Sequence, residues 1–444
     1  MRKGFTLIEL LGLALILLTN ASISADPIPS MYTLSNPPSA PGKAPESLTV
    51  KVGETATFSV EETIVAIPNL PAPTFQWYRN GLEPKHKIEG ATTSTYTTPP
   101  TTLADHGSSF ICVVNGEPLG GYGGLITKAT LSVYAADEKI LDWVKVADHT
   151  EWSDRDSLQP LVFNGKMWIF EGWHGHGWQT ADVWNTANGK TWNFVIPQGP
   201  WKDTDFHSTV VFDDKVWLMG GWHLDEKTSN AVYWSADGVK WEQATAHAAW
   251  SPRGAASVVA FKGKMWLFGG GELVTSGGGD TQVWCSTDGV KWDLATDKPG
   301  WEKRMDHKTV ELKGKLYLYG GRGANKFYND VWSSEDGVTW TKLTDAAAWA
   351  PRIWFGAVAY RDRMWIIGGE GGGYAQLNDV WYSKDGITWK QLKSKVIWRH
   401  KHAHGLCVFQ DKIFIFGGSD FRWAYPQPDN DMWSLEVPED FLDD

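Results

Sequence analysis

The stretch Ser235-Ala236-Asp237-Gly238-Val239-Lys240-Trp241 decides the fold, because close copies of it return at residues 286–292, 334–340 and 383–389. Each copy reads as a strand, an Asp-Gly turn and a second strand. A tryptophan that precedes each unit keeps the same period, with steps of 48 to 51 residues. These leading tryptophans are Trp152, Trp201, Trp250, Trp301, Trp349 and Trp398. Residues 138–438 are therefore interpreted as six copies of one unit.

The remainder of the unit is also regular. An aromatic column is followed by a Gly-Gly pair, by a variable loop and by a second aromatic column; the first column is Trp168, Trp217, Trp266, Tyr317, Trp365 and Phe414. Four short strands in a repeat of this length are typical of a β-propeller blade. The Gly-Gly pair followed by aromatic columns resembles the kelch family, and the Ser-x-Asp-Gly turn resembles a shortened Asp box of sialidase-like propellers. The expected fold is all-β, with a six-bladed kelch-type propeller.

The sixth unit ends at Met432-Trp433-Ser434 and lacks a fourth strand of its own. In the earlier units a Trp-x8-Trp spacing joins the last strand of one unit to the start of the next, as at Trp192 and Trp201. Trp143 and Trp152 have the same spacing. We therefore expect residues 140–146 to pair onto the sixth unit as its outer strand, which would close the propeller and remove exposed sheet edges.

Residues 28–135 resemble an immunoglobulin-like sandwich. Short alternating strands lead to Trp77, which resembles the core tryptophan of that family, and Leu103–Cys112 resembles the corner before its strand F, with Phe110 where the family usually has tyrosine. Val60 stands where the resemblance places the partner cysteine, so Cys112 is expected to be a buried free thiol. The resemblance implies a spacer or adhesive module.

Residues 1–25 have the order of an export signal. Arg2 and Lys3 precede an apolar run, and small residues follow as far as Ala25. The stretch from Gly4 to Glu9 also resembles the type IV prepilin leader, which is cut after its glycine. Both interpretations predict a secreted or cell-surface protein, with membrane contact only through an N-terminal anchor.

Composition and the absence of certain motifs exclude several classes of function. The chain has 444 residues, a net charge of -11 and no long basic run, which argues against a nucleic-acid partner. Its 3 cysteines lie far apart and match neither a disulfide framework nor a metal-ligand spacing. Neither a Gly-x-Ser-x-Gly elbow nor a Walker loop nor a His-Glu-x-x-His motif is present in the sequence.

Binding residues are expected where the repeats differ, in the loops after the Gly-Gly pairs and in the segments after the leading tryptophans. Aromatic planes beside polar groups suit sugar rings. Glu171 is singular because it replaces the first glycine of a Gly-Gly pair. The predicted ligand-binding residues are Glu171, Trp173, His174, His176, Trp178, Trp222, His223, Arg304, Asp306, Arg352, Trp354, His402, Arg422, Trp423 and Tyr425.

Histidines occupy alternate repeats six residues after the leading tryptophan, at His207, His307 and His404. Three neutral imidazoles near one axis would suit a divalent metal. The same residues are also explained as structural histidines that bond to the backbone, as the kelch resemblance implies.

Taken together, the sequence predicts a non-catalytic exported recognition protein, without a cofactor, that binds a glycan or a cell-surface protein through its propeller loops. The alternative is a propeller enzyme acting on sugars, either a mutarotase with Glu171, Asp306 or a loop histidine as acid and base, or a metal-dependent oxidoreductase. A third possibility is a scaffold that assembles surface proteins. Fold alone cannot decide between these functions.

Overall fold

The computed structural model describes residues 47–60, 74–115, 125–174, 179–202, 204–223, 228–272, 279–372, 375–420 and 427–442. Within these ranges the regular secondary structure is almost entirely β-strand, with a few short 3-10 helices. None of the helices in these ranges is long and apolar enough to cross a membrane. The predicted leader, residues 1–25, lies outside the described residues.

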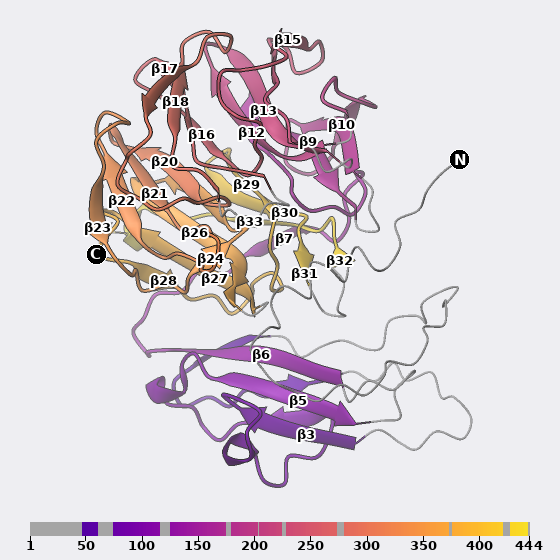
Figure 1. The fold of residues 1–444 in the computed structure, drawn as a ribbon. Coiled ribbons are helices and arrows are strands. Elements are labelled where there is room, and N and C mark those ends of the chain that lie inside the picture. The colour runs from indigo at the N-terminus through magenta and orange to yellow at the C-terminus, as the bar shows by residue number, and fades with distance from the viewer. Residues whose placement is uncertain are drawn as a thin grey trace, which may run out of the picture.

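The first folded unit is a sandwich of two sheets, seen at the bottom of Figure 1. One sheet has the order β1-β6-β5-β3 and the other pairs β2 with β4. Strand β1 runs parallel to β6, and the other pairs are antiparallel. The elements are β1 (Leu48–Lys51), β2 (Thr57–Ser59), β3 (Thr74–Arg79), η1 (Pro84–His86), β4 (Thr95–Thr97), η2 (Leu103–Asp105), β5 (Ser109–Asn115) and β6 (Leu125–Tyr134).

Its core forms around Trp77, which is fully buried and donates from Nε1 to the carbonyl of Thr93 at 2.9 Å. Phe58 stacks on Phe110 with ring centroids 4.5 Å apart. Cys112 is a buried free cysteine in the same cluster as Val60. The expected free thiol is thus confirmed, and burial raises the pKa of Cys112 to about 12.

The remainder of the chain forms six antiparallel sheets in sequence order. The first sheet is β8 (Leu161–Phe163), β9 (Lys166–Trp173), β10 (Gln179–Thr186) and β11 (Asn193–Ile196); the second is β12 (Thr204–Phe212), β13 (Lys215–His223), β14 (Val232–Ser235) and β15 (Glu242–Thr245); the third is β16 (Ser257–Phe261), β17 (Lys264–Phe268), β18 (Val283–Ser286) and β19 (Asp293–Thr296). We refer to these sheets, and to the segments leading into them, as repeats one to six.

Repeats four to six follow the same plan, with a first strand split in two in repeat five. Repeat four is β20 (Lys308–Leu312), β21 (Lys315–Tyr319), β22 (Val331–Ser334) and β23 (Thr341–Thr344); repeat five is β24 (Arg352–Ile353), β25 (Gly356–Tyr360), β26 (Arg363–Gly371), β27 (Ala375–Ser383) and β28 (Lys390–Leu392); repeat six is β29 (Gly405–Phe409), β30 (Lys412–Phe416), β33 (Met432–Leu435) and β7 (Val144–Ala147). A small ribbon of β31 (Ser419–Asp420) and β32 (Gln427–Pro428) and the 3-10 helix η4 (Glu439–Leu442) complete the described chain.

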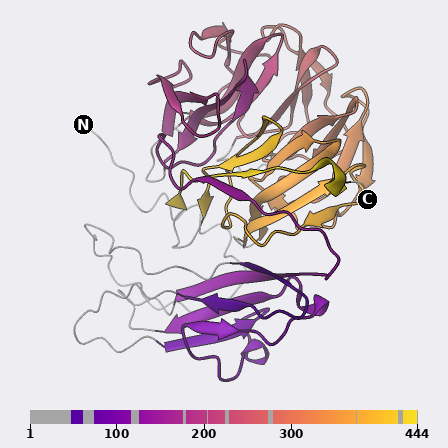
Figure 2. The same ribbon diagram turned by 180° about the vertical axis from the view of Figure 1, so that it is seen from behind.

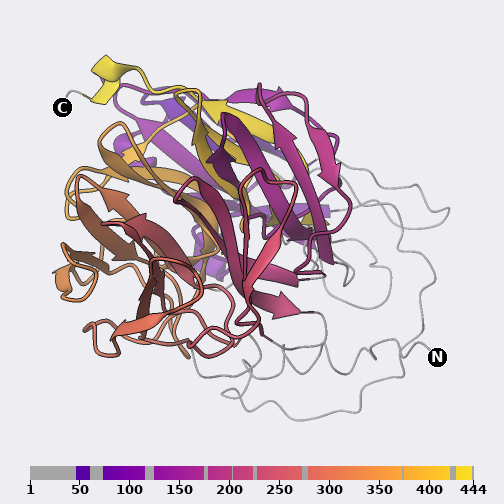
Figure 3. The same cartoon turned by 90° about the horizontal axis from the view of Figure 1, so that it is seen from above.

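The fourth strand of repeat six comes from the opposite end of this region. Strand β7 pairs antiparallel with β33, with Val144 opposite Ser434, so the pairing expected for residues 140–146 is present. Figure 2 shows this early segment running beside the yellow strands of repeat six. The innermost strands contact one another in the cyclic order β8, β12, β16, β20, β25, β29 and back to β8, and the sheets are seen around their common centre in Figure 3.

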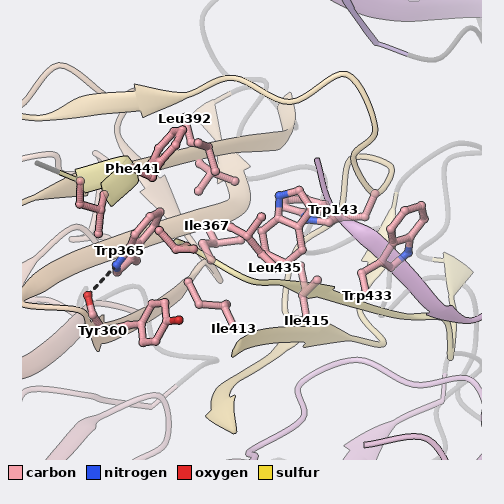
Figure 4. Close-up of a cluster of buried hydrophobic side chains, with 14 residues drawn as sticks. Trp143, Tyr360, Trp365, Ile367, Leu392, Ile413, Ile415, Trp433, Leu435 and Phe441 are labelled. Carbon is pink, nitrogen blue, oxygen red and sulfur yellow. Dashed lines mark hydrogen bonds between the residues drawn. The ribbon is translucent and has the colours of Figure 1, made fainter. Parts of the chain in front are cut away.

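The leading tryptophans pack each sheet against its own fourth strand. Each is fully or almost fully buried and meets edge-on the tryptophan that precedes that strand. The six pairs are Trp152 with Trp192, Trp201 with Trp241, Trp250 with Trp292, Trp301 with Trp340, Trp349 with Trp389 and Trp398 with Trp143. The sixth pair has centroids 5.9 Å apart and joins the two ends of the region. Figure 4 shows Trp143 in a cluster with side chains of repeat six such as Ile415 and Leu435.

The Ser-x-Asp-Gly turn links neighbouring sheets. Asp237 accepts hydrogen bonds from the backbone N–H groups of Val239 and Lys240, and Ser235 accepts from that of Gly238. Gly238 has φ +76, and a Cβ there would lie 2.5 Å from the ring of Trp168 in the preceding repeat. The glycine is therefore needed both for its backbone conformation and for close contact with the neighbouring sheet.

Candidate functional site

The residues that stand three positions after the leading tryptophans form what we call the arginine column: Arg155, Thr204, Arg253, Arg304, Arg352 and Lys401. Its cations form structural ion pairs. Three residues after the leading tryptophan, Arg304 pairs with Asp330 through two bonds of 2.7 and 2.9 Å and donates to the carbonyl of Gly320 at 3.1 Å. Asp330 in turn accepts a bond from Trp332 Nε1 at 2.7 Å. Arg352 has the same arrangement with Asp379 and Gly368. Both arginines are fully buried.

The predictions that Arg304 and Arg352 bind ligand are therefore corrected. Their guanidinium groups are saturated by carboxylates and backbone carbonyls of their own sheets. Burial alone would raise the pKa of Asp330, but the hydrogen bonds and charge of Arg304 outweigh it and leave that pKa below its ordinary value. Arg155 and Lys401 form related ion pairs in repeats one and six.

Repeat two departs from this pattern at three linked positions. Thr204 stands in place of the arginine, Ala231 in place of the aspartate, and Tyr233 in place of the tryptophan whose N–H the aspartate would accept. Repeat two thus lacks the buried cation, the carboxylate that would pair with it and the indole N–H that would donate to that carboxylate. An isolated buried charge costs several kcal/mol, which explains why these positions change together.

Glu171 and His207 fill the space beside this departure. Glu171 is completely buried, and its Oε2 contacts His207 Nδ1 while its Oε1 accepts from the backbone N–H of His207 at 3.3 Å. The other imidazole nitrogen lies 2.9 Å from Thr204 Oγ1. Burial, together with the charge of His223, holds the pKa of His207 well below its usual range. The structure therefore encloses Glu171 between two sheets and does not place it on an open binding surface.

A cavity lies where the six repeats meet. It has a volume of about 50 Å³, and each repeat contributes residues that stand five and six positions after its leading tryptophan, as with Phe206 and His207. The residues at the fifth position all have left-handed backbone, with φ between 51 and 58; they are Ser157, Phe206, Ala255, Asp306, Trp354 and Ala403.

Backbone hydrogen bonds join these left-handed residues around the cavity. The N–H groups of Ala255 and Asp306 donate to the preceding repeat at 3.0 Å. Ala403 donates to Trp354 at 2.7 Å, and Ser157 of repeat one donates to Ala403 of repeat six at 2.8 Å. Left-handed backbone at a bulky residue costs on the order of 1 kcal/mol or more. These bonds offset that cost and hold the variable side chains in place.

Six variable side chains gather in and beside the wall of the cavity, and we call them the central cluster: Phe206, Asp306, Arg322, Trp354, Glu370 and His402. The rings of Phe206 and Trp354, from repeats two and five, meet with centroids 6.4 Å apart. The Arg322 guanidinium lies 5.8 Å from the Trp354 ring and donates from Nε to Asp306 at 2.7 Å. The centroid of the His402 ring lies 5.2 Å from that of the Trp354 ring.

Burial controls the charges in the central cluster. It raises the pKa of Glu370 to about 7, with the charge of Asp306 adding to the effect and that of Arg322 opposing it. It lowers the pKa of His402 to about 3, so that this ring is neutral and its Nδ1 lies 2.6 Å from Gln376 Oε1. Nearby, burial also raises the pKa of Asp156 to about 7 despite hydrogen bonds from Ser419 and Ser157.

The other predicted residues fall into two groups. Trp173, His174, Trp222 and His223 are half-buried at the ends of β9 and β13. In the backbone ladder, Trp173 lies opposite Asp156 and Trp222 lies opposite Asp205 of the same repeats. His174 Nε2 lies 3.1 Å from Ser153 Oγ. The remaining predicted residues lie outside the described residues; they are His176, Trp178, Arg422, Trp423 and Tyr425.

The structure does not bring the three histidines together as metal ligands. In the described ranges, no group of three or more His, Cys, Asp and Glu side chains is placed to hold a metal ion. His307 and His404 each pack against the leading tryptophan of their own repeat, with centroids 6.1 and 5.8 Å apart. His207 is engaged by Glu171.

Sequence reasoning predicted Asp306, Trp354 and His402 as binding residues, and the structure places them in one cluster. It did not select Phe206 or Glu370. A signal was present, because the fifth position after the leading tryptophan is the variable column, with Ser, Phe, Ala, Asp, Trp and Ala in successive repeats. Variation at equivalent positions of an otherwise periodic unit marks the surface on which the repeats differ.

Comparison with known families agrees with this architecture. Residues 257–440 match the model of the KLHDC2/KLHL20/DRC7 Kelch-repeats domain, and residues 46–121 match that of the immunoglobulin domain. The chain thus contains an immunoglobulin domain followed by a Kelch-repeat domain, and the latter indicates a protein-interaction module. No curated protein shows a significant match to the chain.

Proposed function

We propose that residues 138–438 form a six-bladed kelch-type propeller that acts as a recognition module, carried on the immunoglobulin-like domain of residues 28–135. The cyclic contacts of the innermost strands support the closed propeller, as do the pairing of β7 with β33 and the contact of Trp143 with Trp398. Closure of this kind leaves one face on which residues from all six repeats converge.

The observation that carries the proposal is the central cluster. Equivalent positions of the six repeats have diverged there into aromatic and charged residues. Phe206 and Trp354 meet from opposite repeats, and Asp306 pairs with Arg322 within repeat four. Packing does not require this divergence, because Ala255 and Ala403 fill equivalent positions. A rigid backbone that presents variable side chains is the usual construction of a binding face.

For the ligand we propose a glycan. Half-buried indoles at Trp173, Trp222 and Trp354 offer apolar ring faces. The Arg322 guanidinium, held by the buried Asp306, supplies hydrogen-bond donors for sugar hydroxyls. The Arg322 side chain is 28% exposed and so remains open to a ligand. A protein partner on the same face is the other outcome of the experiment below.

The role is proposed to be non-catalytic. The mutarotase alternative needs an accessible acid or base, whereas Glu171 is enclosed and Asp306 is paired with Arg322. The order of residues 1–25 supports export of the chain to the cell surface or beyond. In that setting the immunoglobulin-like domain would act as a spacer.

The test is a glycan array probed with the full chain. Trp354→Ala and Trp173→Ala should each lose binding at least tenfold while keeping the unfolding temperature close to that of the parent. The matched control is Phe194→Ala, which removes a 54% exposed aromatic ring from the outer strand β11, and it should bind normally. Absence of any signal, or equal loss in the control, would overturn glycan recognition by this face.

A further inference from the structure

A lysine faces the central cavity. Seven residues after the leading tryptophan the repeats carry Gln159, Ser208, Ser257, Lys308, Gly356 and Gly405. Only repeat four places a charge at this position. Lys308 lines the cavity together with His307 and His404.

Lys308 is half-buried, and among the described residues Asp306 is the charged group that acts on its ammonium. The nearest opposite charge is that of Asp306, whose carboxylate is engaged by Arg322 at 2.7 Å. Burial lowers the pKa of Lys308, and Asp306 opposes this effect only in part. A half-buried cation whose nearest carboxylate is already engaged is costly unless something else in the cavity compensates it.

Two imidazoles in the same cavity wall lack partners. His307 and His404 are 1% and 6% exposed, and neither ring nitrogen of either residue has a hydrogen-bond partner in the described part of the chain. Burial, with the charge of Arg304 for His307 and of Lys401 for His404, keeps both pKa values well below the ordinary range. Each neutral ring carries one N–H donor for which the protein provides no acceptor.

The cavity has room for a ligand that would satisfy these donors. Gly356 and Gly405 leave their side of the cavity without side chains, and the His404 ring stands beside Gly356. A volume of about 50 Å³ exceeds the roughly 10–15 Å³ that one water molecule requires in such a measure. A small group of a few atoms therefore fits.

We propose that this cavity is a binding site for a small inorganic anion, held by the ammonium of Lys308 and by N–H donors of His307 and His404. The site adjoins the central cluster, because Phe206, Asp306 and Trp354 also line the cavity, but it does not depend on the nature of the ligand bound by that cluster. His207 also faces the cavity but is engaged by Glu171. Asp306 is the one carboxylate in the lining, and its pairing with Arg322 limits its repulsion of an anion.

The experiment follows the thermal unfolding midpoint of the full chain as sodium bromide or sodium phosphate is added in separate series. Anion binding to the folded state raises the midpoint according to mass action. Lys308→Met should lose this response or weaken the apparent affinity at least tenfold, whereas Lys308→Arg should retain it. Lys240→Met is the matched control, because Lys240 is an exposed lysine of a turn, and any general salt effect will appear in it equally.

A second readout separates the site from a merely structural lysine. Without added anion, Lys308→Met should be at least as stable as the parent, because it removes an uncompensated cation. If neither anion gives a response that depends on Lys308, or if Lys308→Met is destabilised in anion-free buffer, the cavity is an ordinary water-filled space and the proposal is wrong.

Discussion

Replacement of Arg304 tests whether the arginine column holds the sheets together. Arg304→Thr would leave Asp330 and the carbonyl of Gly320 without their cation in a buried setting. Removal of one partner of a buried ion pair costs about 3–5 kcal/mol. The loss also removes the contact between the guanidinium and the Tyr328 ring, 4.1 Å away. We therefore expect a fall in unfolding free energy of about 3–5 kcal/mol.

Repeat two supplies the matched rescue. Arg304→Thr combined with Asp330→Ala and Trp332→Tyr copies its combination of Thr204, Ala231 and Tyr233. The triple variant should be more stable than Arg304→Thr alone, because no buried carboxylate or indole N–H is left unpaired. Urea unfolding followed by tryptophan fluorescence measures both variants. A loss below about 1 kcal/mol for Arg304→Thr, as is typical of exposed ion pairs, would refute a structural role.

Three further outcomes are expected. Burial raises the pKa of Asp156 from 3.8 to about 7, so between these pH values the folded chain retains a proton that the unfolded chain has lost. The free energy of unfolding should therefore fall as pH rises from about 4 to 7, by up to about 1.4 kcal/mol per pH unit. Asp156→Asn should reduce this slope in urea unfolding at a series of pH values, and an unchanged slope would contradict the assignment. Gly238→Ala combines a left-handed backbone with a clash against Trp168 and should cost about 1–3 kcal/mol, whereas Gly263→Ala, whose Cβ would meet nothing within 4 Å, should cost less in the same thermal assay. Glu171→Gln should leave ligand binding unchanged while lowering the unfolding temperature, and a selective loss of binding would return Glu171 to the binding site.

Much of the fold could be predicted from the sequence because its repeats are local. The Asp-Gly turns and tryptophan spacing mark strands that pair with near neighbours, and the missing strand of repeat six directed attention to residues 140–146. The observed strand runs from Val144 to Ala147. It begins only at Val144 because the backbone N–H groups of Leu141 and Trp143 donate instead to Lys393 and Val396. The sequence thus predicted which segment forms the strand, whereas the first and last residues of the strand depend on tertiary contacts.

The candidate site was less accessible to sequence reasoning. Phe206 and Trp354 meet across the cavity although they lie in repeats two and five, a contact that only the arrangement of all the sheets creates. Arg304 and Arg352 looked like ligand-binding groups, yet their recurrence in a column already favoured a structural role. Enclosure of Glu171 by His207 depends on two departures from the repeat in adjacent sheets, so neither residue alone indicated it.

The most direct test concerns closure of the six sheets, since both the central cluster and the anion cavity depend on it. Val144 and Ser434 are opposed in the pairing of β7 with β33, and opposed residues of antiparallel strands lie within disulfide range. The double variant Val144→Cys and Ser434→Cys should form this disulfide under mild oxidation, as shown by a cross-linked peptide in mass spectrometry, and should unfold at a higher temperature than its reduced form. Persistence of both free thiols in the folded, oxidised protein would contradict the closed propeller.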